Sequence, residues 1–392
     1  MPKSTISGSG GKPRKPRADF PLFPHGSGRW CKKVRGKFFY FGKVADDPKG
    51  EAALELWLSQ RDEILAGRKP RPADGKVSLR HICNIFLTYK EKLVEAGEIK
   101  QTTWDDYYRT AARLIRVLGG STAAVHLDAE DFGRLREDIA ADWGPVRLGN
   151  EIQRVRSFFR YGYESGLLAV PVRFGPGFKK PTAKTLRLAR AARGPLMFSP
   201  AELRSILEAA PVAIRPMAYL GLNGGLGASD CALLPVEAID LAGGWLDYPR
   251  VKTGVPRRVC LWGETAAALK EWLAVRPEPK NPDHARLAFI TPRGLSYAGA
   301  GKQTHWRVSG EFAKVLKTAG LQRPGRGFYT LRRVFQTVGE ACGDFSAVAA
   351  IMGHVPRQND MGSIYRQAVG DDRLRAVVDY VHDWLFPKIK AE

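Results

Sequence analysis

Two stretches rich in proline, glycine and cations interrupt this 392-residue chain, and they limit the folds that it can adopt. Residues 68–76 (RKPRPADGK) hold two prolines and a glycine but no large apolar side chain, which is typical of an exposed linker. Residues 170–195 hold seven lysines or arginines and no acidic residue, and we expect them to be too polar and too often broken to join a core. The segments on either side should therefore fold as separate domains.

The first segment is predicted to be a basic arm followed by a small sheet and a helix. Residues 1–18 are rich in Ser, Gly, Pro and cations and hold no acidic residue, a composition typical of disordered chain. Residues 29–44 alternate apolar and cationic residues around a turn at Gly36, as short strands do. Residues 51–67 then place apolar residues at helical spacing. We expect residues 19–75 to form one small domain.

The second segment, residues 76–169, is predicted to be entirely helical. Apolar residues recur three and four positions apart in successive stretches, which end on glycines or begin with acidic residues or proline. This pattern indicates a bundle of four or five helices. On its last helix the predicted core stripe consists of Ile152, Val155, Phe158 and Phe159.

The last segment, residues 196–392, is predicted to be an α+β domain made mostly of helices. It opens on a capping box, with Ser199 as the N-cap and Glu202 three residues later. Two strands joined by a turn are expected at 243–251 and 256–262, and a short strand is expected at 287–291. The expected helices include 213–223, 264–274, 305–320 and 371–386.

The formal net charge of +22 favours polyanionic partners, and nucleic acid is the leading one. No long apolar span, signal peptide or lipidation motif is evident, so we expect no membrane partner. The five cysteines are scattered, odd in number and never spaced C-x-x-C. This distribution argues against a disulfide framework or a zinc cluster and predicts a cytoplasmic protein without a metal or other cofactor.

Cations gather in four places that we predict to contact DNA, although a solvated charged face or linker remains the alternative. The sheet of the first domain, the last helix of the bundle, the basic linker and the C-terminal hairpin supply them. The predicted DNA-binding residues are Arg29, Lys32, Lys33, Arg35, Lys37, Arg147, Arg154, Lys179, Lys180, Lys184, Arg187, Arg257 and Arg258.

The stretch 327–365 carries the side chains that suggest chemistry. Arg332 lies on a predicted amphipathic helix, Gly353 and His354 follow a second helix, and Tyr365 lies on a further short helical segment. In a basic protein, such a set suits phosphoryl transfer to a side-chain hydroxyl. Fixed cations stabilise the charge that builds on the attacked phosphate, and an acid protonates the leaving oxygen. A phosphotyrosine keeps the bond energy, so rejoining needs neither ATP nor metal.

With these residues the sequence resembles the tyrosine recombinases (the phage integrase family) over about residues 78–386. The second box of that family, H-x-x-R, ends here at Arg332, and its G-H pair corresponds to Gly353 and His354. The nucleophile corresponds to Tyr365 and the hairpin lysine to Lys252. The resemblance implies that the arginine grips the scissile phosphate, the histidine hydrogen-bonds it, the lysine acts as general acid and the tyrosine attacks.

Two catalytic positions depart from the family pattern. Gly227 stands where the arginine of G-L-R-x-x-E is expected, with Asp230 at the glutamate. Tyr329 replaces the histidine of the second box, although its phenol can still donate a hydrogen bond to phosphate. Losing one such donor costs on the order of 3 kcal/mol, or about a hundredfold in rate. The cations that could replace the missing arginine are Arg215, Arg250, Arg257 and His305.

The resemblance also implies a partner and an assembly. It predicts an arm-type DNA-binding domain, a core-binding bundle and a catalytic domain that act on double-stranded DNA as a homo-tetramer on two sites. The C-terminal helix could pass to a neighbour or pack on its own domain. Two other functions remain open, namely a catalytically impaired homologue that binds DNA as a regulator or accessory protein, and a type IB topoisomerase-like relaxing enzyme. A metal-dependent nuclease finds little support, because no ligand cluster stands out.

Overall fold

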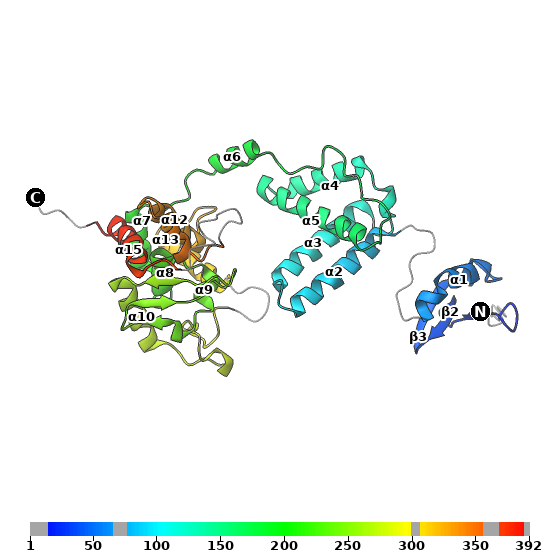
Figure 1. Ribbon diagram of the computed structural model, residues 1–392, viewed down its shortest axis with the longest axis horizontal. Helices are drawn as coiled ribbons and strands as arrows, with labels where there is room; N and C mark the ends of the chain where they lie inside the picture. The colour runs from blue at the N-terminus through cyan, green and yellow to red at the C-terminus, as the bar shows by residue number, and fades with distance from the viewer. Residues whose placement is uncertain (1–14, 66–76, 299–305, 356–367, 388–392) are drawn as a thin grey trace, which may run out of the picture. The chain divides into compact units, whose positions relative to one another are not determined.

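The structure is a computed structural model that describes residues 15–65, 77–298, 306–355 and 368–387. The chain divides into two compact units, residues 1–186 and 187–392, and its buried apolar residues form three separate cores. Helices dominate, with two small antiparallel sheets (Figure 1). The predicted multidomain fold class is therefore confirmed. Most of the predicted basic arm and the linker 68–76 lie outside the described residues.

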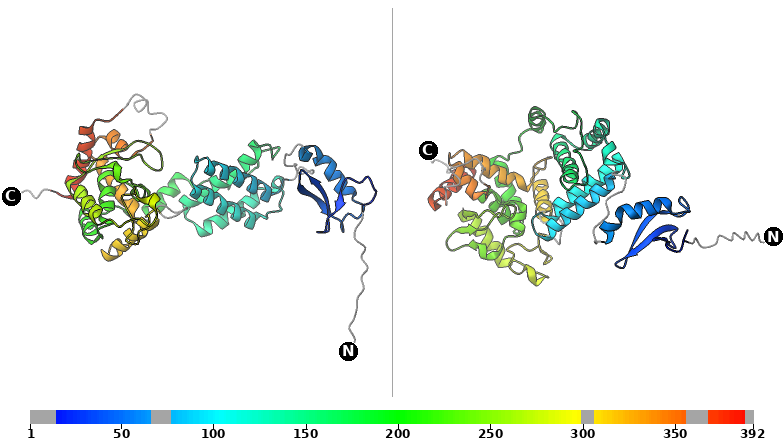
Figure 2. Two further views of the ribbon diagram at one scale, coloured as in Figure 1. Left: turned by 90° about the horizontal axis from the view of Figure 1, so that it is seen from below. Right: turned by 45° about the vertical axis from the view of Figure 1, so that its right-hand side comes forward.

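The first domain is a three-stranded antiparallel sheet with one helix packed on it, as predicted. The hairpin turn is made by Arg35 and Gly36, whose φ values of 49° and 82° suit a tight turn between twisted strands. Trp57 of the helix meets Phe41 of the sheet edge-on, with ring centroids 5.6 Å apart. Figure 2 shows the helix lying along one face of the sheet. The elements are β1 (Phe23–Pro24), β2 (Arg29–Val34), β3 (Lys37–Lys43) and α1 (Glu51–Leu65).

The helical bundle has four main helices, and the predicted core stripe on the last of them is buried. Ser78 caps the first helix by accepting the N–H of His81 at 3.3 Å, as short polar residues do at helix N-termini. Inside the bundle the Thr110 hydroxyl donates to the buried Glu151 carboxylate at 2.7 Å. The helices are α2 (Leu79–Glu95), α3 (Gln101–Leu118), α4 (Ala129–Asp142) and α5 (Pro145–Glu164), with a 3₁₀ turn at Ala124–His126.

The basic stretch 170–195 is not entirely excluded from the core, which corrects the expectation from its composition. Phe178 is buried in the bundle core, and Phe174 stacks on it with ring centroids 5.7 Å apart. Further along, the stretch forms the short helix α6 (Ala183–Ala191), which has no buried residue. Two aromatic rings therefore anchor a stretch whose prolines, glycines and cations otherwise indicate a linker.

The C-terminal domain is mostly helical around a small sheet of order β4-β5-β6. The expected hairpin is present, and the sheet gains β4, which the sequence did not indicate. The strand predicted at 287–291 is wrong, because Leu287 and Ile290 make only isolated bridges. The elements are α7 (Pro200–Ala209), α8 (Arg215–Gly224), α9 (Ala228–Ala232), β4 (Ile239–Asp240), β5 (Trp245–Asp247), β6 (Arg258–Cys260), α10 (Gly263–Val275), α11 (Trp306–Thr318), α12 (Phe328–Glu340), α13 (Phe345–Ile351) and α15 (Asp371–Leu385), with 3₁₀ turns at Val236–Ala238 and Pro282–His284.

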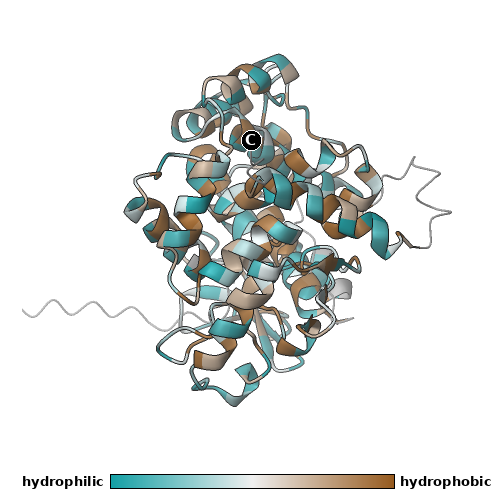
Figure 3. Ribbon diagram, turned by 90° about the vertical axis from the view of Figure 1, so that its left-hand side faces the viewer, coloured by the Kyte–Doolittle hydropathy of each residue, from teal (hydrophilic) through white to brown (hydrophobic). Residues whose placement is uncertain are grey.

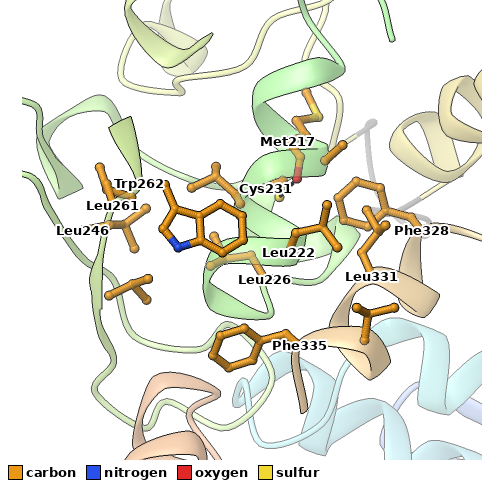
Figure 4. Packing of buried hydrophobic residues seen from close by; sticks show 14 of the residues in the cluster. Met217, Leu222, Leu226, Cys231, Leu246, Leu261, Trp262, Phe328, Leu331 and Phe335 are labelled. Atoms are coloured by element: carbon orange, nitrogen blue, oxygen red, sulfur yellow. Dashed lines mark hydrogen bonds between the residues drawn. The ribbon is translucent and has the colours of Figure 1, made fainter. Parts of the chain in front are cut away.

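Helices α8 and α12 form the centre of this domain. A Cβ atom added at Gly221 of α8 would lie 3.0 Å from Cβ of Leu331 on α12, so the glycine permits their close approach. Figure 4 shows Leu222 between the indole of Trp262 on one side and Phe328 on the other. Figure 3 shows hydrophilic and hydrophobic residues alternating along the helices, as amphipathic packing requires.

Polar anchors fix this core to the sheet and to the last helix. The buried Asn223 amide donates to the Cys260 carbonyl at 2.8 Å and accepts the N–H of Trp262 at 2.9 Å. The Trp262 indole N–H donates to the Val378 carbonyl of α15 at 3.0 Å. The buried residues of α15 belong to the core of this domain, so in the single chain that helix packs on its own domain.

Candidate functional site

Arg332 is held inside the C-terminal domain by two backbone carbonyls. It projects from the buried face of α12 and is only 2% exposed. Its Nη1 donates to the carbonyl of Gly225, and its Nη2 donates to the carbonyl of Met352 at 2.8 Å. The two carbonyls follow α8 and α13, so the guanidinium joins three helices at one point. Among the described residues, no carboxylate lies within ion-pairing distance of it.

Gly353 and His354 follow α13 in a Schellman turn. The N–H of Gly353 donates to the Ala350 carbonyl, and the N–H of His354 donates to the Ala349 carbonyl, each at 3.0 Å. Gly353 has a φ of 60°, a conformation that glycine adopts without a Cβ penalty. The turn places His354 two residues after Met352, whose carbonyl accepts a hydrogen bond from Arg332. Local helix-ending chemistry therefore positions the predicted histidine.

The hairpin between β5 and β6 reaches the same turn. Thr253 Oγ1 donates to the carbonyl of Gly353 at 3.1 Å, and Arg250 Nη1 lies 3.5 Å from that oxygen. A Cβ at Gly353 would lie 2.8 Å from Cβ of Arg250, so the two segments pack closely. Lys252 lies between these two hairpin residues and is exposed. The structure thus brings the hairpin that carries the predicted general acid to the turn that carries His354.

Asp230 connects several segments near Gly227, the position where the arginine of the family pattern is absent. Its Oδ2 accepts the backbone N–H of Gly227 at 2.8 Å, and its Oδ1 accepts the N–H of Val251 at 3.2 Å. Arg257 Nη1 also lies 3.4 Å from Oδ2, and the Arg257 side chain has no exposed surface. The Arg257 Nη2 is buried without a hydrogen-bond partner among the described residues. This carboxylate therefore joins the start of α9 to Val251 in the hairpin turn and to Arg257 just before β6.

The electrostatics of the site follow from this arrangement. Burial, and then the charge of Arg250, lower the pKa of Arg332 to about 10, while Asp230 acts in the opposite direction. Burial is also the largest cause that lowers the pKa of His354, followed by the charges of Arg332 and Arg250. The imidazole is therefore neutral at neutral pH and holds one N–H donor. The charges of Arg250, Arg257 and Asp230 all act on Arg332, so three guanidinium groups share one carboxylate and this cluster is positive.

One further predicted residue, Tyr329, is placed differently from its neighbour Arg332. Tyr329 lies on α12 but on its outer face, 58% exposed, with the Arg333 guanidinium 5.4 Å from its ring centroid. Tyr365 and His305 lie outside the described residues. A hollow of about 640 Å³ is lined by none of the predicted catalytic side chains, and its walls are residues 193–196 and 323–326.

The first domain presents most of its predicted cations at the surface, although not on one face. Lys33 pairs with Phe38 across the sheet, and both are exposed with the ammonium 5.3 Å from the ring centroid. Lys32 extends instead over Trp57 of α1, 5.6 Å from the ring centroid. The sequence pattern led us to expect Arg29, Lys32, Lys33, Arg35 and Lys37 on one face of this sheet; neighbouring side chains on a strand point to opposite faces, so this expectation is wrong for Lys32. The other predicted cations of this domain are exposed, namely Arg29, Arg35 and Lys37.

Some cations predicted to contact DNA have partners within the chain. Arg154 ion-pairs with Asp106 and Glu151 inside the bundle, which gives it a structural role. Arg257 is buried, which contradicts its prediction as a surface contact. Arg258 is paired with Asp247 at 2.5 Å and Asp371 at 2.9 Å. The remaining predicted cations of the bundle and linker are exposed, namely Arg147, Lys179, Lys180, Lys184 and Arg187.

Within the described ranges, no helix is long and apolar enough to cross a bilayer. The same residues contain no group of three or more His, Cys, Asp or Glu side chains that could hold a metal ion together.

Solved structures with a similar chain fold are integrases. No family model and no curated protein matches this sequence. A lambda integrase tetramer bound to a Holliday junction is 17% identical with a TM-score of 0.53, covering 86% of this chain and 96% of its own. The Tn1549 transposon integrase in complex with transposon right-end DNA is 14% identical with a TM-score of 0.57, covering 78% of this chain and 100% of its own. This chain therefore has the fold of the tyrosine recombinases, the class of both integrases.

Proposed function

We propose that this chain is a site-specific DNA recombinase or integrase that cleaves and rejoins DNA through a 3′-phosphotyrosine intermediate. Double-stranded DNA is its partner, and a homo-tetramer on two DNA sites is its working assembly. The similarity to an integrase tetramer on a Holliday junction supports both parts of this proposal. The exposed cations of the first domain and of the linker supply contacts to the DNA backbone.

The observation that carries the proposal is the buried charge of Arg332, which pairs directly with no carboxylate of the described residues. A buried cation is costly unless an anion pairs with it, and the described residues give this guanidinium only carbonyl partners. Arg250 and Arg257 act on it as further positive charges. A DNA phosphate bound here would supply the missing negative charge. Such a site favours a transition state whose phosphate oxygens carry more charge than the ground state does.

Each residue then has a chemical role. The Tyr365 hydroxyl attacks the scissile phosphorus and gives its proton to a water molecule, while the bond from phosphorus to the 5′ oxygen breaks. Lys252 protonates that leaving oxygen, from a hairpin anchored to the turn before His354. The guanidinium of Arg332 and the N–H of His354 donate hydrogen bonds to the non-bridging oxygens. Tyr329 is exposed and can donate a further hydrogen bond from the second-box position.

A covalent trap tests this function. Duplexes bound by the chain are first selected from a randomised pool and are then prepared with a nick beside each candidate phosphate. Cleavage releases a short 5′-hydroxyl fragment that diffuses away, so the protein stays attached to the DNA. We expect an adduct that survives denaturation, maps to Tyr365 by peptide mass, and is absent with Tyr365→Phe. Binding without any adduct in the wild-type chain contradicts the enzymatic function.

Gly227 favours a second candidate function, a DNA-binding regulator or accessory protein that has lost catalysis. At this position the backbone N–H bonds to Asp230, and no side chain reaches toward a phosphate. In that case the same selection recovers bound duplexes, and neither the wild-type chain nor Tyr365→Phe forms an adduct.

A further inference from the structure

The absence of an arginine at Gly227 raises the question of which group replaces it. Three described arginines are candidates, Arg215, Arg250 and Arg257, and they come from different parts of the C-terminal domain. A replacement must lie beside Arg332 and His354, must keep a charge that no carboxylate neutralises, and must have a surface that a phosphate can reach. These three conditions separate the candidates.

Arg215 fails the first condition. Its Nε donates to the Leu207 carbonyl at 3.2 Å, and its Nη1 lies 3.7 Å from the Glu271 carboxylate. These partners belong to α7 and α10 and contribute nothing to the site. Arg257 fails the second condition, because Asp230 neutralises its charge.

Arg250 meets all three conditions. Its Nη1 approaches the Gly353 carbonyl at 3.5 Å, and its charge acts on both Arg332 and His354. Among the described residues no carboxylate lies within ion-pairing distance of it, and its side chain is half-buried rather than enclosed. The long carbonyl contact leaves most of its five N–H donors for another acceptor.

We propose that Arg250 supplies the second guanidinium to the scissile phosphate, in place of the arginine that is absent at Gly227. This inference rests on the proposed function. In this chain the guanidinium that binds the phosphate comes from the hairpin rather than from the start of α9. The same hairpin carries Lys252, so it supplies both a phosphate-binding group and the general acid. Asp230 holds the two locations together, because it accepts N–H groups from Gly227 and from Val251, the residue after Arg250.

The first test compares Arg250→Ala and Arg250→Lys with the wild-type chain in single-turnover adduct formation on the nicked duplex. We expect Arg250→Ala to slow the reaction on the order of a hundredfold and Arg250→Lys to recover part of the loss. Arg215→Ala is the matched control, because it removes an arginine of the same domain, and its rate should equal that of the wild type.

A neutral phosphate separates a catalytic from a structural role. Replacing one non-bridging oxygen of the scissile phosphate by a methyl group removes the charge that the guanidinium neutralises. The ratio of wild-type to Arg250→Ala rates should then fall close to one. A structural role for Arg250 predicts the same ratio on the charged and the neutral substrate.

Restoring the family arginine provides an independent test. Gly227 has a φ of −87°, and the nearest atom to an added Cβ is Asp230 Oδ2 at 3.3 Å, so the position accepts a side chain with a small shift of that carboxylate. We expect Gly227→Arg to raise the rate of the Arg250→Ala chain toward the wild-type rate. The matched control combines Gly227→Lys with Arg250→Ala. It restores a positive charge but not the planar guanidinium, which can donate two parallel hydrogen bonds to a phosphate.

The outcomes distinguish the inference from the function on which it rests. A wild-type chain that forms no Tyr365-dependent adduct overturns the proposed function. A wild-type adduct together with full activity of Arg250→Ala, or with equal losses on both substrates, overturns the role of Arg250 and leaves the function standing. A lower rate of adduct formation in Arg250→Ala that occurs only on the charged substrate, and that Gly227→Arg reverses, supports the inference.

Discussion

Arg250 and Arg332 contact the carbonyls of two adjacent residues: Arg250 Nη1 lies 3.5 Å from the oxygen of Gly353, and Arg332 Nη2 lies 2.8 Å from the oxygen of Met352. One guanidinium comes from a hairpin and the other from a buried helix. The turn that follows α13 is therefore a common contact for two like charges. Without an anion between them their repulsion is unfavourable, so the arrangement suits a site that binds phosphate.

The close packing at Gly353 predicts that Gly353→Ala displaces Arg250. The added Cβ would lie 2.8 Å from Cβ of Arg250. Its positive φ alone costs on the order of 1 kcal/mol in a residue with a Cβ. We expect a loss of unfolding free energy beyond that amount, together with slower adduct formation. Gly343→Ala is the control, because Gly343 has a φ of 90° and open space at its Cβ. Equal effects of the two substitutions on stability and activity contradict the prediction.

The ion pair of Asp230 with Arg257 predicts that Asp230→Asn destabilises the C-terminal domain. Asparagine keeps one oxygen to accept the Gly227 N–H but loses the acceptor for the Val251 N–H, together with the charge opposite a buried guanidinium. Breaking a buried pair in this way costs about 3 kcal/mol. Adding Arg257→Met removes the orphaned charge and should recover part of that loss in urea unfolding. A double variant less stable than Asp230→Asn would show that Arg257 stabilises the fold through its other contacts.

The pKa of His354 should rise when Arg250 loses its charge. Burial lowers this pKa most, followed by the charges of Arg332 and Arg250, while Glu340 raises it. The folded chain therefore binds fewer protons than the unfolded chain, and stability falls as the pH drops below about 6.5. We expect a higher imidazole pKa in Arg250→Gln by NMR titration, and a smaller loss of stability at acid pH. An unchanged titration would place the two side chains too far apart to interact.

The salt dependence of DNA binding should show whether the linker cations contact the phosphate backbone. Lys179 and Lys180 are exposed, and each lysine that contacts a phosphate contributes about one to the slope of log K against log salt. We expect the double variant Lys179→Gln, Lys180→Gln to reduce that slope by about two on any duplex sequence. Lys314→Gln is the matched control, because Lys314 pairs with Glu311 at 2.7 Å. A slope that both variants leave unchanged would exclude the linker from the DNA contact.

The sequence alone was sufficient for most local structure. Periodicity and helix signals predicted the bundle stripe, the capping box at Ser199 and the hairpin turn at Gly36, because these depend on neighbours along the chain. The prediction of a strand at 287–291 was wrong because a short apolar run fits a buried loop as well as a strand. Only hydrogen bonding to a neighbouring strand decides between the two. Phe178 was misjudged for a related reason, since cations and prolines around an aromatic ring do not reveal whether it packs.

The order of Lys252, Arg332, His354 and Tyr365 along the chain was enough to indicate a phosphoryl-transfer site. Which of the remaining arginines joins that site was decided only by the tertiary structure. Arg250 and Arg257 lie on one hairpin in similar basic surroundings, yet one approaches Gly353 and the other is buried against Asp230. The physical reason is that pairing and burial depend on residues more than twenty positions away, which no local pattern encodes.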